Sequence, residues 1–142
     1  MKKRNIRQEA IRQLVRQRHI RTQRDLVEGL EEQNFSCTQA TVSRDINEMG
    51  LKKLPEGVYI LPEDLLLQRL VADLVHSVVV ANNLVVVKTA AGSAQGVAAA
   101  LEAAGEPEVL GSVAGDDTIL VVATDNDQAK TFEAAINKLR LR

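Results

Sequence analysis

Two adjacent carboxylates, Asp116 and Asp117, begin an apolar run in the stretch V-A-G-D-D-T-I-L-V-V of residues 113–122. General acid–base catalysis requires two carboxylates to face each other across a substrate, whereas neighbours on a strand point to opposite faces. A hard cation requires more oxygen ligands than this stretch supplies. Two interpretations remain open: a solvated Gly-Asp-Asp turn, and a site where a carboxylate binds a guanidinium through two charge-assisted hydrogen bonds.

A second group of polar residues falls on a segment with helical spacing, T-Q-A-T-V-S-R-D-I at residues 38–46. Val42 and Ile46 are separated by one helical turn and are expected to point inward. The side chains that then face outward are those of Gln39, Ala40, Thr41, Ser43 and Arg44. Arginine bonds guanine O6 and N7, glutamine pairs with adenine, and hydroxyls reach phosphates or base edges. The segment is therefore a candidate DNA-reading helix.

The same segment allows a second interpretation, in which the domain docks another protein and Arg44 forms a surface salt bridge with Asp45 or Glu48. Charge is unevenly distributed along the chain. Residues 1–62 hold 12 basic and 8 acidic side chains, and residues 63–142 hold 6 basic and 11 acidic ones. The basic half is the candidate for a polyanion, but a mildly basic solvated domain has the same balance.

The elements around the candidate helix can be predicted from local patterns. Apolar residues at helical spacing predict a first helix over residues 5–18, and a capping box that begins at Thr22 predicts a second helix. Thr38 is expected to cap the third helix, and Gly50 to end it. The stretch L-K-K-L-P-E-G-V-Y-I-L-P, which follows, predicts two short strands around a turn.

Three helices followed by a hairpin are the plan of a winged helix-turn-helix domain, here over residues 1–62. The third helix then enters the major groove with its N-terminal half. Lys52 and Lys53 of the hairpin, together with the arginines of the first helix, are expected to contact phosphates.

The pattern changes after residue 62. The stretch V-V-V-A-N-N-L-V-V-V predicts two buried strands joined at Asn82-Asn83. Further expected elements are a helix over 92–104, strands near 108–113 and 118–123, and a helix over 126–139. The expected fold class is α/β, with three parts: the winged helix-turn-helix domain at 1–62, a linker with helical turns at 63–74, and a β-β-α-β-β-α domain of the α+β type at 75–142.

Composition and the scarcity of reactive side chains exclude several protein classes. No run approaches the roughly 18 apolar residues of a membrane span, and the basic N-terminal stretch is followed by no apolar segment of a secretory signal. The single cysteine, Cys37, cannot form an internal disulfide, which fits a cytoplasmic protein. His19 and His76 lie in different modules. Neither a nucleophile–base pair nor a phosphate loop nor metal-ligand spacing is recognisable, so no enzymatic activity is expected.

The front half resembles a known family. The stretch T-Q-A-T-V-S-R-D-I, followed by M-G-L-K-K at residues 49–53 and V-Y-I-L-P at residues 58–62, resembles the DNA-binding domain of bacterial arginine repressors. The Ser-Arg pair that is central to operator binding in that family falls on Ser43 and Arg44. The resemblance implies double-stranded operator DNA as a partner. The candidate DNA-binding residues are Gln39, Thr41, Ser43, Arg44, Lys52 and Lys53.

The back half resembles the C-terminal domain of the same family. It carries the motif G-D-D-T at residues 115–118 and the small-residue segment A-A-G-S-A-Q at residues 90–95, which opens a helix. The resemblance implies that this domain forms trimers, that two trimers stack into a hexamer, and that L-arginine binds as corepressor at the trimer–trimer interface. The arginine-loaded hexamer then binds palindromic operators at arginine-metabolism genes.

Ligand residues are carried over position by position. Asp116 resembles the aspartate that pairs with the arginine guanidinium across the interface, and Asp117 resembles the one that meets the α-ammonium group. The other matching positions are Gln95, Glu102, Ser112 and Ala114. Glu102 stands where some members carry Asp, and its extra methylene displaces the carboxylate. Glu102 therefore keeps a second hypothesis open: a DNA-binding regulator that responds to a different small molecule, or one whose C-terminal domain serves only assembly.

Overall fold

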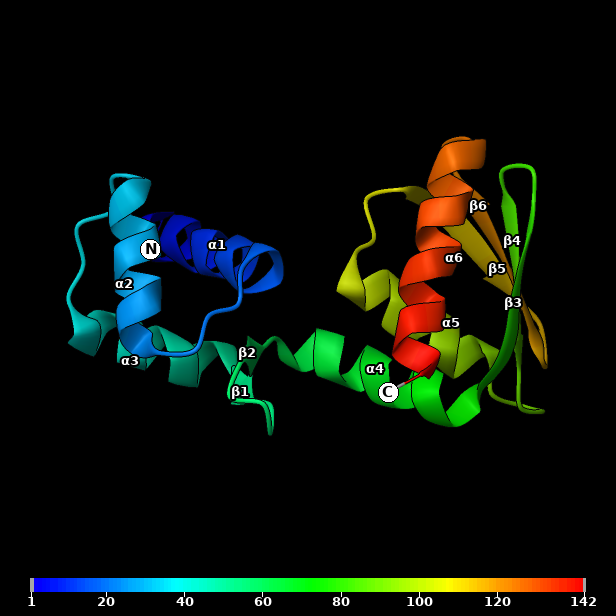
Figure 1. Cartoon of the computed structure of the whole chain (residues 1–142), viewed down its shortest axis with the longest axis horizontal. Helices are drawn as coiled ribbons and strands as arrows, with labels where there is room; N and C mark the ends of the chain where they lie inside the picture. The colour runs from blue at the N-terminus through cyan, green and yellow to red at the C-terminus, as the bar shows by residue number, and fades with distance from the viewer. Residues whose placement is uncertain (1, 142) are drawn as a thin grey trace. The chain divides into compact units, whose positions relative to one another are not determined.

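The structure, a computed structural model, describes residues 2–141. The chain divides into two compact units, one that ends at Pro62 and one that begins at Glu63. Figure 1 shows their helices and strands, coloured along the chain. No helix in the described range is long and apolar enough to cross a membrane.

The first unit has three helices and a two-stranded hairpin, in the order expected of a winged helix-turn-helix domain. Its elements are α1 (Lys2–Gln17), α2 (Gln23–Glu32), α3 (Gln39–Met49), β1 (Lys52–Lys53) and β2 (Tyr59–Ile60). The two strands are antiparallel, with Lys52 opposite Ile60 and Lys53 opposite Tyr59. The core draws side chains from all three helices and from the residue after β2, each at most 1% exposed: Ile11, Leu14, Leu26, Leu30, Val42 and Leu61.

Side-chain caps set the ends of α2 and α3 where the sequence predicts them. The side chain of Thr22 accepts a hydrogen bond from the backbone of Asp25, and the Asp25 carboxylate accepts one from the backbone of Thr22. Thr38 accepts from the backbone N–H of Thr41 at the start of α3, and Gly50 ends that helix with a φ of 69°. This left-handed conformation is one that glycine adopts without steric cost.

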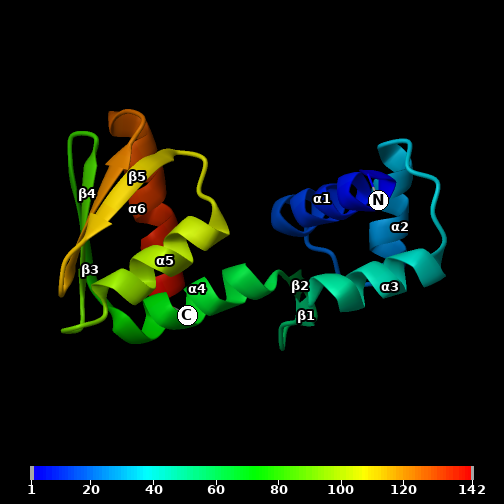
Figure 2. The same ribbon diagram turned by 180° about the vertical axis from the view of Figure 1, so that it is seen from behind.

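The second unit is a four-stranded antiparallel sheet with helices on one face. Its elements are α4 (Pro62–Leu74), β3 (Val75–Ala81), β4 (Leu84–Thr89), α5 (Ala94–Ala104), β5 (Val109–Ala114), β6 (Thr118–Ala123) and α6 (Asn126–Arg140). The strand order is β3-β4-β6-β5, so β3 and β5 are the edges. Figures 1 and 2 show α5 and α6 against the same face. The core between the sheet and these helices includes Val85, Val87, Ile119, Val121, Phe132 and Ile136.

The segment expected to be a linker, residues 63–74, is helical. Pro62 occupies the first position of α4, where its missing N–H costs no intrahelical hydrogen bond. Leu67 and Val71, one turn apart, are buried in the core of the second unit, and Leu74 packs against that core. The helix is therefore part of the second unit and contributes side chains to its core.

The opposite face of the sheet is uncovered within the described chain. Val79 pairs with Val86, Val86 with Leu120, and Leu120 with Val113, so their side chains form one row across all four strands. Val79 is 57% exposed, Leu120 39% and Val113 72%. The expectation of buried strands therefore holds for the helix-covered side only, because the valine runs alternate between the two faces. These four residues are called the open face below.

Candidate nucleic-acid interface and ligand site

Helix α3 presents polar side chains on the side away from the core. Gln39 and Arg44 are exposed, while Thr41 and Ser43 are half-buried. The orientation follows from Val42, which is fully buried between them. In the part of the chain that the structure describes, Arg44 forms no hydrogen bond or ion pair. Its guanidinium therefore keeps all five N–H donors available for a partner outside the unit.

The two carboxylates nearest to that guanidinium in sequence have other partners. Asp45 accepts hydrogen bonds from Nε and Nη2 of Arg7 at 2.5 and 2.9 Å. Glu48 accepts one from Gln8 at 2.9 Å and lies 3.7 Å from Nη1 of Arg4. The surface salt bridge that the protein-docking interpretation required is therefore not formed. Two arginines of α1 have their charge compensated by α3, which weakens the expectation that they contact phosphates.

Asp45 is expected from the sequence only as a surface partner of Arg44, and sequence reasoning missed that it is buried. Its side chain is 1% exposed. Burial would raise the pKa of Asp45, but hydrogen bonds from Arg7 and Gln8 and the charges of Arg7 and Arg4 outweigh it, so the pKa lies below its usual value. The hydrogen bond to Asp45 in turn raises the pKa of Arg7. A signal was present in the sequence, because Asp45 follows Val42 by three residues and shares its inward helical face.

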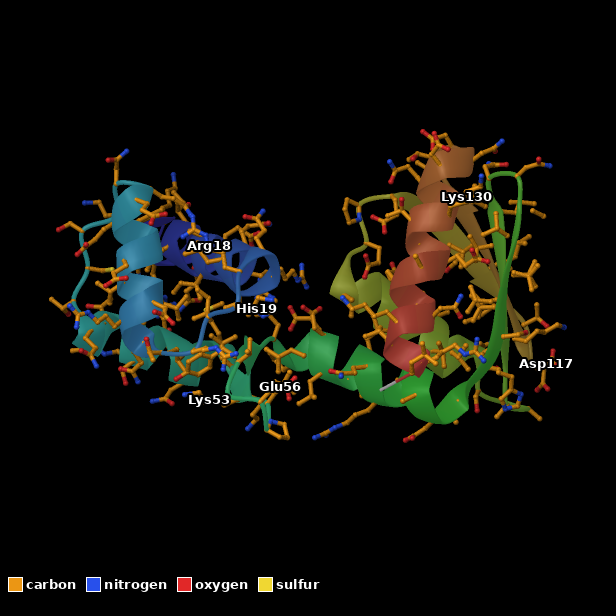
Figure 3. The ribbon with its side chains drawn as sticks, viewed as in Figure 1. Arg18, His19, Lys53, Glu56, Asp117 and Lys130 are labelled. Carbon is orange, nitrogen blue, oxygen red and sulfur yellow. The ribbon has the colours of Figure 1, made fainter. Side chains whose placement is uncertain are left out.

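The hairpin of β1 and β2 carries two exposed cations, Lys52 and Lys53. Nζ of Lys53 lies 5.1 Å from the centre of the Tyr59 ring, within the range of a cation–π interaction. Arg21, which precedes α2, donates a hydrogen bond to the backbone carbonyl of Glu56 in the hairpin turn at 2.9 Å. Figure 3 shows Lys53 and Glu56 on this hairpin. The hairpin is thus tied to the helical part of its unit.

Asp116 and Asp117 lie in the turn between β5 and β6. The carbonyl of Asp116 accepts a hydrogen bond from the N–H of Ala94 at 3.2 Å, and that of Asp117 accepts one from the N–H of Thr89 at 2.8 Å. The turn is therefore bound to the first residue of α5 and to the last residue of β4. Both aspartates are exposed, and Figure 3 shows Asp117 pointing outward at the end of the sheet.

The two aspartates differ in their side-chain contacts. Oδ1 of Asp117 accepts a hydrogen bond from the hydroxyl of Thr118 at 2.8 Å, and that hydroxyl oxygen accepts one from Nζ of Lys88 at 2.7 Å. Within the described residues, the carboxylate of Asp116 has no hydrogen-bond or ion-pair partner. Asp117 is thus held in one orientation, whereas all acceptor sites of the Asp116 carboxylate remain available.

The other expected ligand residues line up along α5 and β5. Gln95 and Glu102 are both exposed and are seven residues apart, which places them on one face of α5 and about 10 Å from each other. Ser112 and Ala114 lie on the helix-covered side of the edge strand β5, because they pair with core residues of β6.

A pocket of about 320 Å³ lies where the C-terminal part of α5 meets β5. Glu102, Glu106 and Ser112 line it, and Val121 and Phe132 contribute apolar surface. The pocket therefore brings together two of the expected ligand residues. Its lining does not include the four others, Gln95, Ala114, Asp116 and Asp117. Among residues 2–141, no group of His, Cys, Asp or Glu is placed to hold a metal ion.

Two family models match the chain: arginine repressor, DNA binding domain, over residues 1–66, and arginine repressor, C-terminal domain, over residues 71–138. The arginine repressor of Carboxydothermus hydrogenoformans is 49% identical over 143 residues, which cover 93% of this chain and 95% of that protein. The arginine repressor of Koribacter versatilis is 44% identical over 92% of this chain and 93% of its own length. With both units matched in the same order, the chain belongs to the arginine repressor family.

Proposed function

We propose that this chain, an arginine-responsive transcriptional repressor by its family, binds palindromic operator DNA in the cytoplasm as a hexamer, with L-arginine as corepressor. One observation carries the proposal: each unit presents an exposed charge without a partner in the described chain, Arg44 in the first and Asp116 in the second. An unpaired guanidinium suits guanine and phosphate, and an unpaired carboxylate suits the guanidinium of a ligand.

In the DNA-binding unit, α3 reads bases and the hairpin contacts the backbone. Arg44 donates to O6 and N7 of a guanine, and Gln39 pairs with an adenine. The side chains that position the unit on phosphates or base edges are Thr41, Ser43, Lys52 and Lys53. The Tyr59 ring restricts Lys53 before DNA arrives, so less side-chain entropy is lost on binding.

In the C-terminal unit, Asp116 pairs with the guanidinium of an arginine bound across an interface, and Asp117 meets the α-ammonium group. Thr118 orients Asp117 before the ligand arrives. The remaining contacts are assigned to Gln95, Glu102, Ser112 and Ala114. A single chain leaves the two aspartates outside the pocket that holds Glu102. The proposed site is therefore completed by a second chain.

The open face of the sheet is the proposed surface on which copies of the chain assemble into trimers. An exposed apolar row across four strands is typical of a protein interaction site. When two trimers stack, facing Asp116 carboxylates repel until a guanidinium neutralises them. Arginine then stabilises the hexamer by mass action, and the hexamer presents several DNA-binding units at once.

Calorimetric titration with L-arginine tests the ligand, with citrulline as control. Citrulline keeps the amino-acid end and lacks the cationic guanidinium. We therefore expect arginine to give a heat of binding and citrulline to give none. Fluorescence anisotropy of labelled operator DNA, with and without arginine, tests the coupling between ligand and DNA. An operator affinity that does not depend on arginine, or a silent arginine titration, contradicts the proposal.

Glu102 favours a second candidate, a repressor of the same architecture that answers to another small molecule. Its carboxylate lines the pocket beside Ser112 and reaches one methylene further than the Asp of some family members. A longer carboxylate leaves less room, so a shorter cationic amino acid such as ornithine is the competitor to test. Tighter binding of ornithine than of arginine supports this candidate.

A further inference from the structure

Three side chains of α1 hold two carboxylates of α3, and we call this cluster the α1 brace: Arg4, Arg7, Gln8, Asp45 and Glu48. Arg7 donates hydrogen bonds to the Asp45 carboxylate from two guanidinium nitrogens, at 2.5 and 2.9 Å. Gln8 bridges the two carboxylates, because its amide nitrogen lies 3.0 Å from Asp45 and 2.9 Å from Glu48. Arg4 lies 3.7 Å from Glu48. The brace therefore holds the first and the fourth residue after Arg44 on α3.

The first consequence is that the rotation of α3 about its axis is fixed. Apolar packing by Val42 is non-directional, whereas a guanidinium fork binds a carboxylate in one plane. Asp45 directly follows Arg44, so their side chains differ by about 100° around the helix. Once the brace points Asp45 toward α1, the direction of Arg44 is also set.

The second consequence concerns competition for Arg44. Glu48 follows Arg44 by four residues, the spacing at which oppositely charged side chains meet on a helix surface. An Arg44–Glu48 pair would occupy the guanidinium that is proposed to bind DNA. Gln8 and Arg4 hold Glu48 on the α1 side instead, and Arg44 has no partner in the described chain.

Stability alone does not account for such a cluster, since a buried ion pair can often be replaced by apolar side chains at no loss of stability. We propose that Arg7 is a positioning residue for operator recognition: it fixes the direction of Arg44 through Asp45 and, with Gln8, keeps α3 carboxylates away from Arg44. This inference rests on the proposed base contact of Arg44.

Arg7→Lys in the arginine-loaded full-length protein tests the inference, because lysine keeps the charge and loses the fork. The matched control is Arg18→Lys, since Arg18 pairs with Glu32 of α2 at 2.8 Å and not with α3. We expect Arg7→Lys to weaken operator binding about tenfold while non-specific DNA binding changes little, because the loss falls on a base contact. Arg18→Lys should change neither affinity.

A double-mutant cycle with Arg44→Ala shows whether the effect passes through Arg44. In the Arg44→Ala background, we expect Arg7→Lys to cause no further loss of operator affinity. Equal losses in both backgrounds, or wild-type operator affinity of Arg7→Lys, overturn the positioning role. Wild-type operator affinity of the single variant Arg44→Ala overturns the proposed base contact. A failure of the base contact can therefore be distinguished from a failure of the positioning role of Arg7.

Salt dependence separates positioning from direct contact. If Arg7 itself bound a phosphate, Arg7→Gln would lower the slope of log affinity against log salt by about one. We expect an unchanged slope, and a lowered slope overturns the inference. Thermal unfolding of each variant establishes that it is folded, and the cycle with Arg7→Lys decides the question if Arg7→Gln does not fold.

Discussion

The hydroxyl of Thr118 donates to Oδ1 of Asp117 at 2.8 Å and accepts from Nζ of Lys88 at 2.7 Å. The orientation of Asp117 is therefore set within one chain, before any ligand is present. Asp116, its neighbour, has no such constraint among the described residues. In the proposed ligand site, Asp117 thus supplies a preset acceptor, and Asp116 supplies the carboxylate that adjusts to the guanidinium of an arginine bound across the interface.

Thr118→Val keeps the shape of the side chain and removes the hydroxyl. We expect arginine affinity to fall about tenfold, because a hydrogen bond that involves a charged group contributes about 1.5 kcal/mol or more. Calorimetric titration measures the change. Thr131→Val is the matched control, since the Thr131 hydroxyl bonds the backbone carbonyl of Asp127 within α6. Wild-type arginine affinity in Thr118→Val would mean that Asp117 needs no orienting partner.

Asp116→Asn keeps the size of the side chain and removes its charge. We expect arginine binding to weaken by at least about tenfold, because the guanidinium loses a charge-assisted partner. Arginine-promoted operator binding should weaken in parallel, as anisotropy titrations at fixed salt would detect. The matched control is Asp127→Asn, an exposed position in the first turn of α6. An Asp116→Asn protein with unchanged arginine dependence would contradict the proposed role.

The helix boundaries could be predicted because their determinants are local. The caps at Thr22 and Thr38 and the left-handed Gly50 each act within a few residues. The hairpin at Asn82-Asn83 follows the same rule, since Ala81 pairs with Leu84 directly across it. Where a sequence pattern and its physical cause lie in the same short stretch, propensity and capping chemistry suffice to predict where an element begins and ends.

Other features could not be predicted because their causes lie far apart in the chain. Asp45 is buried on account of Arg7, which is 38 residues away. Glu102 and Ser112 line one pocket only because α5 packs against β5. The segment expected to be a linker with helical turns is a different case, since Leu67, Val71 and Leu74 do show helical spacing. That pattern alone does not say which core the helix joins.

The open face predicts that a charged substitution within it weakens the association between copies of the chain. Leu120 is central in it, paired with Val86 on one side and Val113 on the other. Because an unpaired charge is costly in a dry interface, we expect Leu120→Asp to weaken association by more than about 2 kcal/mol per interface. Sedimentation velocity should then report a smaller species, with native circular dichroism.

Ala134→Asp serves as the control for the change in charge, because Ala134 is exposed on α6, on the other side of the sheet. We expect this variant to keep the wild-type mass. If Leu120→Asp also keeps the wild-type mass, the copies of the chain do not associate through the open face.

The Arg7–Asp45 pair predicts how stability depends on pH. Burial would raise the pKa of Asp45, but its partners lower it on balance. A carboxylate with a depressed folded pKa adds stability above its unfolded pKa of about 3.9 and loses it as pH falls through the folded value. At pH 7 we expect Asp45→Ala to lower the free energy of unfolding by about 3 kcal/mol. This is the low end for a buried pair, because Arg7 is 18% exposed and can reach water.

Urea unfolding of the wild type and Asp45→Ala, at pH 7 and again near pH 3, measures the contribution of Asp45 to the free energy of unfolding. We expect the stability gap to narrow at the lower pH, because protonated Asp45 no longer attracts the guanidinium. Arg7, whose pKa the hydrogen bond to Asp45 raises, stays charged throughout, and Cys37, whose pKa burial raises, stays neutral. The comparison is repeated in a Glu48→Gln background, because Glu48 shares Gln8 with Asp45. A gap of equal size at both pH values would mean that Asp45 stabilises the unit by packing, and that its charge contributes nothing.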